Sequence, residues 1–226
     1  MLYRAIIGAL LCGALSISVA AEPDIDYSYF DVGFNRSQPD IDELAILGPV
    51  QAGDDTLDGF SLEGSVELSE AWYFWGHYSS TDSDQVLRSE IICVASPCPN
   101  TFEFERDVWG AGLGYHYPLS SRTDLVAELG YQRSEIGVII PTEGASSKIG
   151  FSEKSEPAGA LGIRSRVSER VELGARLNYS EANFNDFSIS ANGLFRLGDS
   201  NWWASLKIEG ADDFENYIAG IRYSFD

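Results

Sequence analysis

Alternation between apolar and polar residues runs through almost the whole chain after residue 57. In FSLEGSVEL (60–68) the apolar side chains fall on one parity and the polar ones on the other, and LVAELGYQ (125–132) and VELGARLNY (171–179) repeat the pattern. A period of two residues is typical of β-strands, and no segment beyond residue 21 shows the 3.6-residue period of a helix. The chain is therefore predicted to be all-β.

The alternating segments predict ten strands joined by short and long connections in turn. The strands are expected at 25–35, 58–68, 72–80, 103–117, 123–134, 157–168, 171–181, 187–197, 201–210 and 215–225. The long connections are expected at 36–57, 81–102 and 135–156. An even number of antiparallel strands with this loop pattern predicts an up-and-down transmembrane β-barrel, with eight strands as the alternative count.

The charged residues indicate which face of the strands meets lipid. A soluble lipocalin-like barrel hides its apolar face, whereas a membrane barrel turns that face outward and its charges inward. The apolar faces end in Tyr or Trp, as expected of girdles at the two membrane interfaces. Acids and bases on the other face nearly balance although the chain carries a formal charge of −20, so the surplus acid is expected in the loops. The predicted lumen ion-pair network comprises Glu63, Glu67, Glu128, Glu172, Glu209, Arg164, Arg166, Arg176, Arg196, Lys207 and Arg222.

The first residues, MLYRAIIGALLCGALSISVAAEPD, predict export. One base, Arg4, precedes an apolar run that small residues close, which is the pattern of a cleaved signal peptide over 1–21, followed by one barrel domain over 22–226. The apolar run is shorter than the ~20 residues that a membrane helix needs. Because export leads to an oxidising compartment, Cys93 and Cys98 are expected to form a small loop disulfide. A metal site there is the weaker alternative, since no His or third Cys is near in the sequence.

The final strand, YIAGIRYSFD, places its apolar residues on one parity and Arg222 on the other. It must pair with the first strand, because a lipid-exposed sheet edge is not tolerated in a membrane. Its outward residues resemble the terminal signal that the barrel assembly machinery reads, although Asp226 makes the last aromatic residue penultimate. The residues that match this assembly signal are Tyr217, Ala219, Ile221, Tyr223 and Phe225.

Two further segments add to this resemblance: GLGYHYPLSSRTDL (112–125) and DGFSLEGSVELSE (58–70). With the final strand, they make the chain similar to small outer-membrane β-barrel proteins of the opacity and OmpA-type group. It resembles most closely a set of surface barrels of similar length that sometimes carry a quorum-sensing-linked label. The resemblance implies a Gram-negative outer membrane, with lipid, lipopolysaccharide and the assembly machinery as partners. Arg133, above the outward-facing Tyr131, offers a contact for a lipopolysaccharide phosphate.

Histidine is the residue that decides whether this barrel has catalytic machinery. Omptin-like proteases and lipid acyl-modifying barrels both need one, and this chain has two, His77 and His116. His116 is expected at the periplasmic end, far from an outer-rim site, and His77 in mid-lumen as a hydrogen-bonded filler. No nucleophile, phosphate-loop or metal-binding motif is present in the sequence. We therefore expect no enzyme activity, no cofactor and no metal.

The expected function follows from the narrow lumen and the negative charge. Ten strands lie near the size at which side chains fill the interior, so a lumen plugged by long basic side chains is predicted. The negative charge argues against nucleic acid as a partner. The sequence therefore predicts a structural or surface-interaction protein, with an unidentified extracellular ligand. A narrow porin-like pore, an outer-membrane enzyme and a soluble lipocalin-like protein stay open as alternatives.

Overall fold

The computed structural model describes residues 25–39, 50–51, 56–83, 87–89, 101–142, 145–181, 187–211 and 214–225. The described part is all-β, and its long strands close into one ten-stranded antiparallel barrel, as predicted. In chain order these strands are β1 (Tyr29–Pro39), β3 (Leu57–Ser69), β4 (Trp72–Asp82), β6 (Thr101–Ser120), β7 (Thr123–Thr142), β8 (Ala145–Ser168), β9 (Val171–Ser180), β10 (Phe187–Arg196), β11 (Trp202–Ala211) and β12 (Phe214–Ser224).

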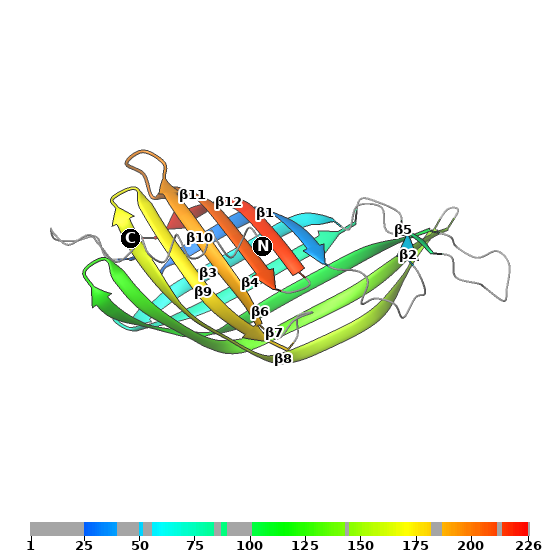
Figure 1. The fold of residues 1–226 in the computed structure, drawn as a ribbon, viewed down its shortest axis with the longest axis horizontal. Helices are drawn as coiled ribbons and strands as arrows, with labels where there is room; N and C mark the ends of the chain where they lie inside the picture. Colours follow the sequence, from blue (N-terminus) through cyan, green and yellow to red (C-terminus); the bar gives the residue numbers. More distant parts are fainter. Residues whose placement is uncertain are drawn as a thin grey trace.

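Every long strand pairs with its neighbours in sequence, and the first pairs with the last. The closing pair runs antiparallel from Tyr29 opposite Ser224 to Pro39 opposite Phe214. Figure 1 shows this seam, with β12 and β1 side by side at the top of the barrel. Closure leaves no main-chain edge of the barrel wall unpaired, which is the condition for a sheet to cross lipid. The alternative count of eight strands is thereby excluded.

The connections predicted to be long contain more strand than the sequence indicated. The predicted loop 135–156 is largely a β-hairpin, because β7 continues to Thr142 and β8 starts at Ala145 in a continuous ladder. Two short strands, β2 (Val50–Gln51) and β5 (Leu87–Ser89), pair with each other, and β5 also pairs with β6. In Figure 1, β6, β7 and β8 extend beyond the other long strands at the end of the barrel where β2 and β5 lie. A continued ladder satisfies main-chain groups that a loop would leave to water, so these segments favour strands.

The outer face of the barrel is an apolar belt. Phe34, Leu129 and Leu161 are 54%, 76% and 55% exposed, values that a soluble protein rarely gives large apolar side chains in a continuous band. Aromatic residues lie at both edges of the belt. Those near the short turns are Trp72, Tyr115, Tyr117, Trp202, Tyr223 and Phe225, and those at the other end include Tyr131, Tyr179, Phe187 and Tyr217. Short turns face the periplasm in such barrels, which fixes the orientation.

The inner face is polar and in places very tightly packed. Arg106, Glu128, Arg164, Glu172 and Arg222 are all buried, which reverses the usual distribution of a soluble domain. The soluble lipocalin-like alternative is therefore wrong. Among the described residues there is no helix long and apolar enough to cross a membrane. The predicted signal peptide over 1–21, and the predicted disulfide between Cys93 and Cys98, lie outside the described residues.

Candidate functional site

The most deeply buried charges of the lumen come from the β8–β9 hairpin. Arg164 donates from Nε and Nη2 to Oε1 of Glu172, at 2.8 and 2.6 Å, and only 4% and 1% of the two side chains are exposed. Arg166 lies opposite Glu172 in the ladder and reaches its other oxygen at 3.5 Å. One carboxylate therefore accepts from two guanidinium groups at the periplasmic end of the barrel.

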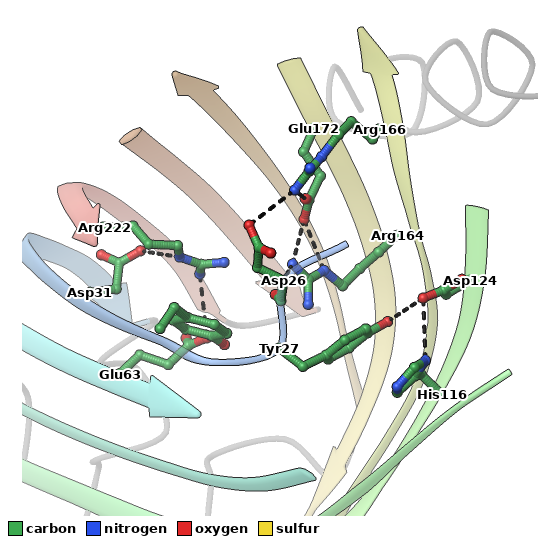
Figure 2. A network of polar contacts seen from close by, with 11 residues as sticks. Asp26, Tyr27, Asp31, Glu63, His116, Asp124, Arg164, Arg166, Glu172 and Arg222 are labelled. Atoms are coloured by element: carbon green, nitrogen blue, oxygen red, sulfur yellow. Dashed lines mark hydrogen bonds and ion pairs between the residues drawn. The ribbon is translucent and has the colours of Figure 1, made fainter. Parts of the chain in front are cut away.

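A short segment preceding β1, residues 25–28, lies inside the lumen against this hairpin, and we call it the N-terminal plug. Arg164 donates to the carbonyl oxygen of Asp26 at 3.1 Å, and Arg166 lies 3.4 Å from the Asp26 carboxylate. The Tyr27 hydroxyl donates to Asp124 on β7 at 2.9 Å. Figure 2 shows Asp26 pointing to the arginines while Tyr27 extends toward Asp124 and His116. The plug is thus attached to the part of the wall formed by β7, β8 and β9, where Asp124 and Arg164 lie opposite each other in the ladder.

Aromatic contacts also hold the plug in place, in addition to its polar contacts. The Tyr27 ring stacks on His116 at 4.0 Å and on Tyr73 at 4.8 Å, and the guanidinium of Arg164 lies 4.5 Å from the Tyr27 centroid. Ile25, Tyr27, Tyr73 and Val126 form a buried apolar cluster. Stacked rings and a cation over an aromatic face add stability beyond the buried area.

Burial also sets the protonation of the plug's own titratable groups. It raises the pKa of the Tyr27 hydroxyl well above its ordinary value, and Arg164 offsets this only in part. Tyr27 therefore keeps its proton and stays a donor to Asp124. Burial likewise raises the pKa of Asp26, against the opposing charge of Arg166.

Two more ion clusters lie above the plug. Arg222 donates to Asp31 at 3.1 Å, approaches Glu63 at 3.7 Å and lies 3.6 Å from the ring centroid of Tyr29. Tyr29 in turn donates to Glu63 at 2.6 Å. In the second cluster, Glu128 accepts from Arg176 at 3.0 Å and from Tyr73 at 2.7 Å. The Tyr73 hydroxyl thus connects this cluster to the apolar contacts of the plug.

The predicted lumen residues are brought together to different degrees. Eight of the eleven make ion pairs: Glu63, Glu128, Glu172, Arg164, Arg166, Arg176, Lys207 and Arg222. Glu209 accepts instead from Ser188 and Asn178, at 2.6 and 3.4 Å. Glu67 and Arg196 lie at the periplasmic rim, where the amide of Glu67 donates to Ser28 and Arg196 donates to the carbonyl of Ser200.

Sequence reasoning missed four members of the network: Asp26, Tyr27, Asp31 and Asp124. Asp31 and Asp124 share the parity of the inward face, opposite Phe30 and Leu125, so the alternation itself carried a signal for them. Asp26 and Tyr27 were predicted to lie within the first strand, at 25–35, which was wrong, because β1 begins only at Tyr29 and extends to Pro39. The period of a strand therefore did not apply to their side chains.

The extracellular half of the lumen holds a cavity of about 190 Å³. Its floor includes Arg222, Glu63 and Arg176, and its walls reach Ser37, Ser180 and Phe214 near the extracellular ends of their strands. His77 lines the cavity and stacks on Trp75 at 5.7 Å, in mid-lumen as predicted. The lumen is thus packed at the periplasmic end and hollow at the other.

The outer surface above the belt carries acids that accept from interfacial tyrosines. Tyr78 donates to Asp107 at 3.0 Å and Tyr217 to Glu215 at 2.7 Å. Arg133, considered above as a contact for lipopolysaccharide phosphate, donates to Glu135 at 2.7 Å and lies 3.0 Å from Glu153. A phosphate would therefore have to compete with two carboxylates for this guanidinium.

The residues of the predicted assembly signal lie on the outer face of β12 and just beyond it. Ile221 is 50% exposed and Phe225 is 48% exposed, while Arg222 is buried in the lumen. Tyr223 packs edge-on against Trp202 at 4.9 Å and against Phe225 at 5.3 Å. Within the described ranges, no group of three or more His, Cys, Asp or Glu side chains is placed to hold a metal ion.

Comparison with known proteins finds solved structures that the chain resembles, but it finds no matching sequence family. No protein-family model and no curated protein sequence matches the chain. The solved structures that it resembles include the outer membrane protease OmpT from Escherichia coli, at 11% identity and a TM-score of 0.49, covering 92% of this chain and 99% of that one. They also include OprG from Pseudomonas aeruginosa, at 12% identity and a TM-score of 0.44, covering 88% of this chain and 97% of OprG. Ail of Yersinia pestis matches at 14% identity and a TM-score of 0.39, covering 88% of this chain and 97% of Ail.

The identity of the chain rests on its own geometry. A closed sheet satisfies its main chain without water, and the apolar belt requires a bilayer around it. Aromatic girdles flank that belt, and the charges are enclosed in the lumen, the arrangement of barrels in bacterial outer membranes. From these features we conclude that the chain folds as a small transmembrane β-barrel of the kind found in bacterial outer membranes.

Proposed function

We propose that this barrel is a non-enzymatic, non-conducting protein of the outer membrane that acts through its extracellular surface. The observation that carries the proposal is the N-terminal plug. Its contacts to Arg164, Arg166 and Asp124 fill the periplasmic end of the lumen, where a pore would need an open path. Lipid, lipopolysaccharide and the barrel assembly machinery are its proposed partners, and the acidic groups above the belt face the first two.

The absence of catalysis is part of the same proposal. A general base needs a partner within hydrogen-bond reach in an accessible site. His116 lies 3.4 Å from the Asp124 carboxylate, but it is stacked on Tyr27 at the periplasmic end of the lumen. His77 stacks on Trp75, and Lys207 and Glu63 line the same cavity. Neither arrangement resembles an acid–base pair at the outer rim.

A narrow pore is the second candidate, and the extracellular cavity favours it. If the plug left the lumen, the cavity would still be separated from the periplasm by the clusters around Glu172 and Glu128. The Glu172 cluster joins the neighbouring strands β8 and β9, whereas Glu128 on β7 accepts from Arg176 on β9 and from Tyr73 on β4. A pore would therefore need at least two groups of hydrogen-bonded side chains to rearrange.

Conductance in planar lipid bilayers tests the proposal. The wild-type barrel is expected to give no stable current steps, and Tyr27→Ala should give brief, irregular openings because the stack and the bond to Asp124 are lost. Tyr131→Ala, which removes an outward-facing tyrosine, is the matched control and should stay silent. Steady ohmic conductance of the wild type, in samples whose folding is verified by heat-dependent gel mobility, would overturn the non-conducting assignment.

A further inference from the structure

The charges around the extracellular cavity nearly cancel. Its lining contributes five bases, Arg106, Arg164, Arg176, Lys207 and Arg222, and four acids, Asp31, Glu63, Glu128 and Glu209. Most of them are already joined in the pairs described above, and Arg164 is matched by Glu172 just below the cavity. A strongly charged ligand would have to break such pairs, which is costly once they are buried. The cavity therefore favours an uncharged ligand.

One wall of the cavity presents polar atoms that have no partner within the protein. Asn35 and Ser37 on β1 are 4% and 2% exposed, and Asn216 on β12 lies directly opposite Ser37 in the ladder. The Oδ1 atoms of both asparagines and the Oγ atom of Ser37 are buried without a hydrogen bond. We call these three residues the β1–β12 polar patch. Buried polar atoms are normally satisfied, so this patch calls for a partner from outside the chain.

A nearby part of the wall, on β9 and β10, satisfies comparable polar groups within the protein. Asn178 on β9 donates to Ser190 and Ser188 at 3.1 and 3.2 Å, and Ser188 donates onward to Glu209 at 2.6 Å. The two parts of the wall carry similar residue types in the same barrel. The difference is that the polar atoms on β9 and β10 are bonded to one another, whereas the three atoms of the β1–β12 polar patch have no hydrogen bond within the protein.

Hydroxyl groups are the chemistry that fits this patch. The oxygen and nitrogen of an asparagine amide can exchange places when the amide flips, so the atom that faces the ligand is either an acceptor or a donor. A hydroxyl group both donates and accepts, so it can bond to the amide in either orientation. A carboxylate or phosphate only accepts and would leave Oδ1 of Asn35 or Asn216 unsatisfied. The cavity is below the roughly 300–1,000 Å³ of sites for drug-sized ligands, which suits a small solute. Trp75, with its Nε1 also unpaired, adds an apolar ring with one donor at the same cavity.

We propose that the extracellular cavity binds a small, uncharged polyhydroxylated solute of monosaccharide size, held by Asn35, Ser37 and Asn216. The inference rests on the proposed function, because closure by the N-terminal plug would separate the cavity from the periplasm. A solute bound there would stay at the surface and not pass into the periplasm.

Binding of neutral sugars to the full-length barrel in detergent tests this inference. Saturation-transfer NMR and titration calorimetry would use D-glucose, D-galactose, D-mannose, N-acetylglucosamine and myo-inositol, with glucuronate as the charged comparison. At least one neutral compound is expected to bind saturably, and more tightly than glucuronate. The double variant Asn35→Leu/Asn216→Leu removes two hydrogen bonds and should weaken binding about tenfold. Asn201→Leu, at the periplasmic β10–β11 connection, is the matched control and should bind as the wild type does.

The possible outcomes separate the two proposals. No saturable binding across the panel, preference for glucuronate, or equal affinity of the double variant and the wild type would each overturn the sugar site. Conductance of the same wild-type sample reports independently on closure of the lumen. The double variant is not expected to unfold the barrel, because the Oδ1 atoms that it removes have no hydrogen bond within the protein. Heat-dependent gel mobility of each variant verifies folding.

Discussion

Glu172 is the residue on which the periplasmic half of the lumen most depends. Its carboxylate is 1% exposed and accepts from Arg164 and Arg166, which also hold Asp26 of the plug. Two charges removed from water in this way are a weak source of net stability while they stay paired. Removing one partner is different, since the remaining charge is then buried without compensation.

Arg164→Ala is therefore expected to lower the free energy of unfolding by about 3–5 kcal/mol, because the buried Glu172 carboxylate then keeps only the longer, 3.5 Å contact with Arg166. Urea unfolding of the barrel in lipid vesicles, followed by tryptophan fluorescence, measures the change. The control is Arg170→Ala, whose partner Asp199 is 97% exposed, and its cost should stay within about 0.5 kcal/mol. Equal costs for the two variants would contradict this account of the lumen.

At the scale of the strands, β6 and β7 approach each other through a pair of glycines. Gly112 and Gly130 lie opposite one another in the ladder, and both leave room for the indole of Trp75. A Cβ atom at Gly112 would lie 2.6 Å from Cα of Gly130 and 2.8 Å from Cζ2 of Trp75. The glycines on the inward parity are thus required by close approach, and a backbone atom is among the obstacles.

Gly112→Ala is accordingly expected to destabilise the barrel by about 1–3 kcal/mol through overpacking. Gly64→Ala is the matched control, since its Cβ would meet its nearest atoms at 3.6 and 3.7 Å, ordinary contact distances. Its effect should stay within about 0.5 kcal/mol. The same unfolding titration distinguishes them, and a tolerated alanine at 112 would show that β6 and β7 move apart freely.

The alternation of the sequence was sufficient to predict ten strands and which side chains face lipid. It also identified the lumen charges, because inward and outward positions differ in chemistry along every strand. It failed beyond the membrane, where both faces meet water and the signal fades, so the upper parts of β7 and β8 were assigned to a loop. It also failed for Asp26 and Tyr27, whose position depends on contacts with residues about 100 or more positions away. The cavity is likewise a product of packing, which no local pattern encodes.

At the scale of the whole molecule, residues at the end of β12 and just beyond it lie at the seam that closes the barrel. Phe225 is 48% exposed on the outer face, packs against Tyr223, and its amide donates to the carbonyl of Ser28 at 2.8 Å. Phe225 therefore belongs both to the periplasmic girdle and to the seam that joins the last strand to the start of the first.

Phe225→Ala is expected to lower the amount of folded barrel in the outer-membrane fraction severalfold, because it removes the aromatic end of the resembled assembly signal. Phe187→Ala, an outward phenylalanine that is 60% exposed at the other girdle, should accumulate normally. Quantitative gels of unboiled outer-membrane fractions compare the two. Similar loss in both variants would indicate a general need for aromatic residues and no special role of the terminus.

The seam between β1 and β12 also determines how the chain acquires its fold over time. The bond between Asp31 and Arg222 joins residues 191 positions apart, so nearly the entire polypeptide must be present before this contact forms. Contacts of such separation are slow to form, because a very long loop must first be closed. A partly synthesised chain therefore has no stable smaller version of the barrel to adopt. The protein is obliged to remain unfolded, and protected from aggregation, until its last strand is complete.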